Sequence, residues 1–156
     1  MKRFVCLLLC LLLPACALAD SLETTFAAFK VNCAVCGAPE LPVTYTKSPS
    51  DSFDTITYDI AEKTKVGFFD KGGNITGGFA VCLDPATQGD FIALCAAHAL
   101  TFCGITEGIN AYIYILDMFL DARQGKENKA VPVGGVLLQI NPMKTGLNFV
   151  CTKIGD

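Results

Sequence analysis

Two cysteines separated by two residues, Cys33 and Cys36, lie in the stretch VNCAVCGAP. A Cys-x-x-Cys pair can alternate between dithiol and disulfide, and this redox chemistry requires a thiolate with a lowered pKa. The reactive cysteine of such a pair lies at the N-terminus of a helix, where the helix dipole stabilises the negative charge. The chemistry open to Cys33 and Cys36 therefore depends on where their helix begins and ends.

The residues around the two cysteines predict a helix over residues 21–36 that ends with them. Apolar side chains recur at the spacing of one helix face, at Leu22, Phe26, Phe29, Cys33 and Cys36. Asp20 and Glu23 have the spacing of a capping box at the start, and Gly37 is a stop signal. Burial and the helix dipole both disfavour a thiolate at the C-terminal end. We expect a buried core pair or a structural disulfide; a thiol–disulfide protein that uses this pair is the alternative.

Cys82 and Cys151 form a second candidate disulfide. Both lie in segments predicted to be strands, on either side of a helical insertion, and neighbouring positions in one sheet would bring them together. A bridge between them would close a loop of about seventy residues, which stabilises a protein by several kcal/mol in the chain-entropy description. We predict this pairing as a hypothesis that thiol counting can test.

His98 and the nearby cysteines suggest a zinc site, but helix geometry opposes it. Cys95 and His98 share a helix face, whereas Cys103 lies eight residues beyond Cys95, or about 12 Å along a helix. Two sulfurs so far apart cannot both lie about 2.3 Å from one zinc ion. If this helix is continuous, the same separation excludes a disulfide between Cys95 and Cys103. We therefore predict neither a metal site nor a cofactor.

Asp117 and Asp121 are four residues apart, the spacing of neighbours on one helix face. Paired carboxylates can act as general acid and base, but these two share the polar side of an amphipathic helix with Asn110 and Gln124. No nucleophile motif or Ser/His/Asp set accompanies them. We expect a solvated helix face and no catalytic residues, so the chain is predicted not to be an enzyme.

The first nineteen residues have the three parts of a secretory signal peptide. Lys2 and Arg3 precede the apolar run FVCLLLCLLL, and Ala-Leu-Ala at 17–19 would place cleavage before Asp20. The apolar run is shorter than the roughly twenty residues that span a bilayer. The alternative is a lipid-tethered envelope protein, because LPAC at 13–16 loosely resembles a lipobox, in which Cys16 would carry the lipid.

Composition limits the kinds of partner that the exported chain can bind. Removal of residues 1–19 leaves 137 of the 156 residues, the size of a single domain spanning 20–156. Loss of Lys2 and Arg3 changes the net charge from −3 to −5. An acidic chain without a basic cluster argues against nucleic-acid binding, and no segment after the signal has the pattern of a transmembrane helix. Six cysteines remain, an even number that permits disulfides in an exported protein.

Strands and helices are grouped along the chain and do not alternate. The patterns predict strands at 54–60, 65–70 and 74–83, helices at 90–103 and from 109 to about 125, and a closing antiparallel pair, VPVGGVLLQI and LNFVCTKI. Gly77-Gly78 in the third strand predicts a bulge or a close backbone approach. The last helix carries an apolar stripe of Ile109, Tyr112, Ile113, Leu116, Phe119 and Leu120.

This order predicts an α+β fold. We expect an N-terminal helix, a three-stranded meander, two helices and a C-terminal hairpin, with about five mostly antiparallel strands and the helices packed on one face. With an export signal and no catalytic motif, the leading hypothesis is a periplasmic or secreted binding domain of inhibitor-like or chaperone-like type. Its partner would be another protein.

Overall fold

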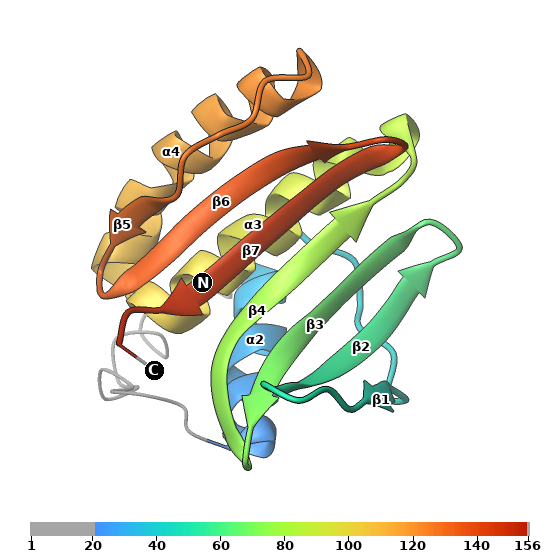
Figure 1. Cartoon of the computed structure of the whole chain (residues 1–156), viewed down its shortest axis with the longest axis vertical. Coiled ribbons are helices and arrows are strands. Elements are labelled where there is room, and N and C mark those ends of the chain that lie inside the picture. The colour runs from blue at the N-terminus through green and yellow to red at the C-terminus, as the bar shows by residue number, and fades with distance from the viewer. Residues whose placement is uncertain (1–20, 156) are drawn as a thin grey trace, which may run out of the picture.

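The computed structural model of the chain describes residues 21–155. They form one antiparallel sheet of seven strands in the order β1-β2-β3-β4-β7-β6-β5, with three α-helices packed against it (Figure 1). The α+β class and the grouping of helices and strands are confirmed. The predicted signal peptide, the cleavage site before Asp20 and the lipidation site at Cys16 lie outside the described residues.

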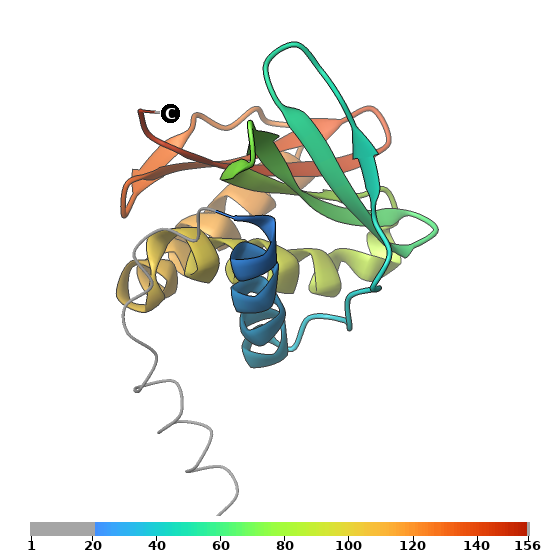
Figure 2. The ribbon, with the colours of Figure 1, turned by 90° about the horizontal axis from the view of Figure 1, so that it is seen from below.

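The helices lie on one face of the sheet, and the opposite face carries no helix of the described chain (Figure 2). Strands alternate their side chains between the two faces, and the large buried apolar side chains of the strands point towards the helices. The helix-facing side of the sheet and the inner sides of the helices make one core.

Helix α2 (Leu22–Cys36) matches the prediction for residues 21–36 closely. Its N-cap is Ser21, whose hydroxyl oxygen accepts a hydrogen bond from the backbone N–H of Thr24; of the predicted capping box, Asp20 lies outside the described residues. The helix ends at Gly37, which has a left-handed φ of 70° and donates its N–H to the carbonyl of Cys33. Glycine adopts this conformation without a steric penalty.

The first half of the sheet is a four-stranded meander. Its strands are β1 (Thr46–Ser48), β2 (Asp54–Ala61), β3 (Thr64–Lys71) and β4 (Asn74–Cys82). Three of them were predicted; β1 was missed because three polar, exposed residues carry no alternating pattern. The register of β3 and β4 shifts beside Phe69, so the predicted irregularity near Gly77-Gly78 is confirmed as a bulge.

Two consecutive helices follow a short 3-10 turn, η1 (Pro85–Thr87). They are α3 (Gln88–Cys103) and α4 (Ile105–Arg123), separated only by Gly104 with a φ of 78°. Helix α3 is buried on most sides, as predicted, because it lies between the sheet and the other helices. The side chain of Asn32 in α2 donates a hydrogen bond of 2.9 Å to the hydroxyl of Thr101 and ties α2 to α3.

The C-terminal strands are β5 (Val131–Val133), β6 (Val136–Met143) and β7 (Gly146–Lys153). The predicted pairing of the last two is confirmed, but residues 131–140 do not form one strand. Gly134 and Gly135 both have positive φ, 53° and 81°, and fold β5 back onto β6. Two adjacent residues with positive φ are the requirement of a tight hairpin turn, and glycine meets it without strain.

The stripe predicted on the last helix is not the side that enters the core. Of its six residues only Phe119 is buried. The buried side of α4 consists instead of Gly108, Ala111, Ile115, Met118, Phe119 and Ala122. Small residues let the helix approach its neighbours closely: a Cβ on Gly108 would lie 2.8 Å from the Cα of Leu100. Close packing thus selected the side with small residues over the side with the larger apolar ones.

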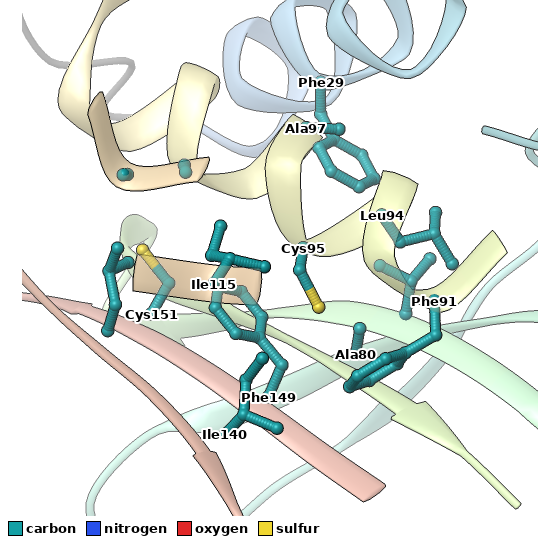
Figure 3. Packing of buried hydrophobic residues seen from close by; sticks show 14 of the residues in the cluster. Phe29, Ala80, Phe91, Leu94, Cys95, Ala97, Ile115, Ile140, Phe149 and Cys151 are labelled. Carbon is teal, nitrogen blue, oxygen red and sulfur yellow. The ribbon is translucent and has the colours of Figure 1, made fainter. Parts of the chain in front are cut away.

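Large side chains from all three helices fill the space above the sheet. Figure 3 shows Phe29, Leu94, Cys95 and Ile115 from the helices pointing towards the strands that carry Ile140 and Phe149. The sulfur of Cys95 lies inside this layer and packs as a small apolar group, as a buried cysteine can.

Candidate interaction surface on the helical layer

The Cys-x-x-Cys pair lies at the C-terminal end of α2, and both of its thiols are free in the structure. Burial, together with the neighbouring Cys36, raises the pKa of Cys33 to about 12. Burial also raises the pKa of Cys36. A dithiol that acts in redox exchange needs a lowered pKa, so this environment opposes the thiol–disulfide alternative.

Cys82 and Cys151 lie on adjacent strands but not opposite one another. In the register of β4 and β7, Cys82 pairs with Leu147 and Cys151 pairs with Gly78. Four residues of strand, about 13 Å, thus separate the two positions. The six cysteines of the described chain are all free, so the predicted bridge is not formed in this structure.

The remaining cysteines are packed into the core or hydrogen-bonded to it. The thiol of Cys82 donates to the carbonyl of Asp84 at 3.0 Å, and the thiol of Cys103 donates to the carbonyl of Val133 at 3.5 Å. Burial raises the pKa of Cys95 and Cys151 well above the usual range and raises that of Cys103 to about 11, with Glu107 contributing. Burial thus disfavours the thiolate, which is the nucleophilic form, at Cys95, Cys103 and Cys151.

His98 is fully buried among aromatic rings between α3 and the sheet. Its ring stacks on Phe29 at a centroid distance of 4.3 Å, and Phe68, Phe102 and Phe149 surround it. Nε2 donates a hydrogen bond of 3.1 Å to the carbonyl of Phe79, while Nδ1 has no partner. Burial lowers the pKa of His98 to about 3, so the ring is neutral at physiological pH.

The other candidate chemical groups do not converge on a site. No group of three His, Cys, Asp or Glu side chains within residues 21–155 is arranged to hold a metal ion. Asp117 is exposed, and the carboxylate of Asp121 pairs with the ammonium group of Lys126 at 2.8 Å. The two aspartates thus lie on the polar, solvent-facing side of α4.

The most distinctive surface feature is a line of apolar side chains along the outer side of α4. We call it the α4 stripe; it consists of Ile105, Ile109, Tyr112, Ile113, Leu116 and Leu120. Ile109 is 63% exposed and Ile113 is 64% exposed. Leu116 is half-buried, and the other members of the stripe are exposed. Charged residues of α4 lie on the other sides of the helix, except Arg123 at its end.

A groove runs beside the α4 stripe, with α3 as its floor. Ile92, Ala93, Ala96 and Leu100 of α3 line it together with Ile109 and Tyr112 of α4, Cys36 of α2, and two glycines, Gly89 and Gly108. Its volume is about 390 Å³. Small residues on α3 and at Gly108 keep the groove open, and no side chain that is charged at neutral pH lines it.

The opposite face of the sheet offers a less exposed apolar cluster. Phe53, Phe69 and Phe79 pack their rings against one another, with centroid distances of 4.9 Å and 5.5 Å. Phe69 and Phe79 are half-buried by these contacts. Aromatic rings that already cover one another gain less from a partner than the separate, exposed side chains of the α4 stripe.

Part of this surface was visible in the sequence and part was not. The sequence identified five members of the α4 stripe as apolar neighbours on a helix but assigned them no side of the fold. The sequence signal for the buried side is the line of small residues Gly108, Ala111 and Ala122, because small residues allow helices to pack closely. A helix with two apolar sides has more apolar surface than one core can cover.

Comparisons with known proteins give no family. No protein-family model matches the chain, and neither the curated proteins nor the solved structures contain a significant match. Within residues 21–155, no helix has both the length and the apolar character required to cross a membrane.

Proposed function

We propose that this chain is an exported, non-catalytic domain that binds another polypeptide through its helical layer. The observation that carries the proposal is the α4 stripe: six apolar side chains stand on the outer side of a helix whose inner side already fills the core. Large exposed apolar patches are uncommon on monomeric proteins and mark interaction sites.

The pattern of the stripe favours a helix as the bound element. Ile105, Ile109, Tyr112, Leu116 and Leu120 follow one another at spacings of three and four residues, which is the spacing of a helix–helix seam. The adjoining groove adds a concave apolar wall over α3. An amphipathic helix docked in an apolar groove is an established mode of polypeptide recognition.

The charges of the helical layer favour a polypeptide over a membrane surface. Across α2, α3 and α4 the basic residues are Lys30 and Arg123, against five acidic ones: Glu23, Asp90, Glu107, Asp117 and Asp121. Helices that lie on membranes carry Lys and Arg on their polar face to meet anionic lipid. This layer has the opposite balance.

Site-specific photocrosslinking tests the proposal in cells of the source organism. A photoreactive amino acid replaces Ile109 or Ile113 in the α4 stripe, and Asn110 or Tyr114 on the polar side of the same helix in the controls. We expect a defined crosslinked polypeptide from the stripe positions and none from the controls, because only the stripe faces a partner.

Three results would count against a polypeptide-binding face. The stripe positions could give no adduct, they could give adducts with lipid alone, or the control positions could give the same adducts at the same yield. The four positions are within two turns of α4, so differences in expression or export do not explain a difference between them.

A further inference from the structure

Asn74, Ile75 and Thr76 form the sequence Asn-x-Thr, which is the acceptor signal for N-linked glycosylation in secreted proteins. Of the six asparagines in the chain, only Asn74 is followed two residues later by a serine or threonine. We propose that Asn74 carries an N-linked oligosaccharide, attached while the chain is exported through a secretory pathway. This inference goes beyond the proposed function, because it assigns a covalent modification and does not depend on a partner of α4.

Asn74 lies where the folded chain has room for a sugar. It is an exposed residue at the start of β4, directly after the turn formed by Gly72 and Gly73, whose φ angles are 66° and 94°. The N–H of Gly73 donates a hydrogen bond of 2.7 Å to the carboxylate of Asp70, which holds this turn in place. A glycan is bulky and hydrated and belongs on a protein surface. The tip of the β3–β4 hairpin meets that requirement.

The side-chain amide of Asn74 is available for modification. Within residues 21–155 it takes part in no hydrogen bond. Two other asparagines use their amides to hold the fold together: Asn32 ties α2 to α3, and Asn128 donates to two backbone carbonyls. A sugar on either of those amides would break such contacts, whereas a sugar on Asn74 displaces none.

The folded hairpin engages the other two residues of the acceptor signal, and this sets the order of events. Ile75 is fully buried, and the hydroxyl of Thr76 donates a hydrogen bond of 3.4 Å to the carbonyl of Phe69. The signal includes this hydroxyl as well as the asparagine amide, so the transferase needs both groups accessible at once. Transfer therefore takes place before the β3–β4 hairpin closes, as the chain is exported.

The co-substrate of this group transfer is an oligosaccharide joined through a pyrophosphate to a membrane lipid. The amide nitrogen of Asn74 forms a bond to the anomeric carbon of the first sugar, while the bond from that carbon to the pyrophosphate oxygen breaks. The lipid pyrophosphate leaves with the bonding electron pair, and the amide nitrogen gives up one proton to a base of the transferase. No atom is oxidised or reduced, so the step needs no further reactant.

The proposed glycan lies away from the α4 stripe. Helix α4 packs mainly on α3, β5 and β6, whereas Asn74 begins β4 at the lower end of the sheet in Figure 1. Successive residues of a strand point to opposite faces, and Ile75 points into the core. Asn74 therefore points towards the face of the sheet that carries no helix of residues 21–155, and a glycan there leaves the α4 stripe open to a partner.

Mass spectrometry of the protein exported by cells of the source organism tests the modification. The intact mass should exceed that of the bare chain, and digestion with peptide N-glycosidase should remove the excess. This enzyme converts a glycosylated asparagine into aspartate, so digestion in heavy-oxygen water should label Asn74 and no other asparagine in the peptide map. The map is made on the wild type, so the result does not depend on whether a variant folds.

Two substitutions at Thr76 form a matched pair. Thr76→Ser keeps the hydroxyl and should keep the glycan, whereas Thr76→Ala removes the hydroxyl and should abolish the mass excess. Asn74→Gln should abolish it as well. Asn110→Gln is the control, because Asn110 is also exposed but lies outside an acceptor signal, and this variant should keep the full mass excess.

The outcomes separate this inference from the proposed function. An exported wild type with an unmodified Asn74 overturns the inference, as does a mass excess that persists in Asn74→Gln or Thr76→Ala. None of these results changes the crosslinks expected from the α4 stripe. Failure of the glycan and failure of the polypeptide-binding face are therefore distinguishable.

Discussion

At the scale of single residues, His98 shows how a titratable side chain can serve as a core residue. Four phenylalanine rings surround it, and Gly78 leaves the space that its imidazole occupies. The unpaired Nδ1 carries a desolvation cost, which the aromatic stacking and the hydrogen bond to Phe79 offset. This environment makes two predictions about stability.

The neutral state of His98 predicts a loss of stability in mild acid. Its pKa is about 3 in the folded protein against 6.5 as a free group, so the unfolded chain binds the proton first as the pH falls. The free energy of unfolding should be level above about pH 6.5 and decrease below it by about 1.4 kcal/mol per pH unit. Urea unfolding between pH 7 and 5 measures this slope.

His98→Gln is the control for that slope. The chain contains one histidine, and glutamine keeps a donor for the Phe79 carbonyl without titrating. The variant should lose the slope between pH 6.5 and 5, whatever its stability at pH 7. An unchanged slope in His98→Gln would show that another group is responsible.

Gly78→Ala should destabilise the fold by about 2 kcal/mol or more, because overpacking forces a buried neighbour to move. A Cβ at this position would lie 2.4 Å from Cε1 of His98. Gly89→Ala in α3 is the matched control, since its Cβ would meet nothing within 4 Å, and alanine is the better helix former. Thermal unfolding of both variants measures the difference; equal melting temperatures would refute the packing of His98 on Gly78.

The thiols make a third prediction at this scale. At pH 8 and without denaturant, iodoacetamide should modify Cys33, Cys95 and Cys151 far more slowly than free cysteine, because burial raises their pKa values. Mass spectrometry after timed alkylation identifies each modified residue. Rapid modification of Cys33 would instead support the thiol–disulfide alternative.

At the scale of elements, α4 has two apolar sides with different roles. Ile115 lies on the inner side and is fully buried, whereas Ile113, one half-turn away, lies on the α4 stripe. The inner side holds the helix to α3 and the sheet, and the outer side remains for a partner. Substitutions on the two sides should therefore affect different properties.

Ile115→Ala should lower the free energy of unfolding by about 2–4 kcal/mol, since it leaves a cavity in the core. Ile113→Ala should change it by less than about 0.5 kcal/mol. Both are measured by urea unfolding. Equal losses from the two substitutions would contradict the assignment of inner and outer sides.

The sequence predicted elements better than it predicted their contacts. Helix ends at Gly37 and Gly104 and the turn after β3 followed from local chemistry, since glycine and its φ angle act within a few residues. The sequence pattern did not predict the turn that divides 131–140 into β5 and β6, because apolar residues continue on both sides of Gly134-Gly135. The side of α4 that enters the core was missed because close packing with Leu100 depends on the tertiary fold.

At the scale of the whole molecule, the sheet carries the three helices of residues 21–155 on one face (Figure 2). This arrangement leaves α4 at the outside of a single layer, and no second layer within the described part of the chain covers its outer apolar side. The α+β class followed from the order of strands and helices. The exposed apolar side of α4 could be located only from the fold, because the fold determines which side of α4 enters the core.

Carbene footprinting of the exported protein in its native setting tests the polypeptide-binding face most directly. In the isolated domain Ile109 and Ile113 are 63% and 64% exposed, against 46% for Tyr114 on the polar side of α4. With labelling normalised to the unfolded chain, a covered stripe predicts that Ile109 and Ile113 are labelled several-fold less than Tyr114, which reverses this order. Labelling that follows the exposed fractions would show that the stripe faces solvent and would contradict the proposed function.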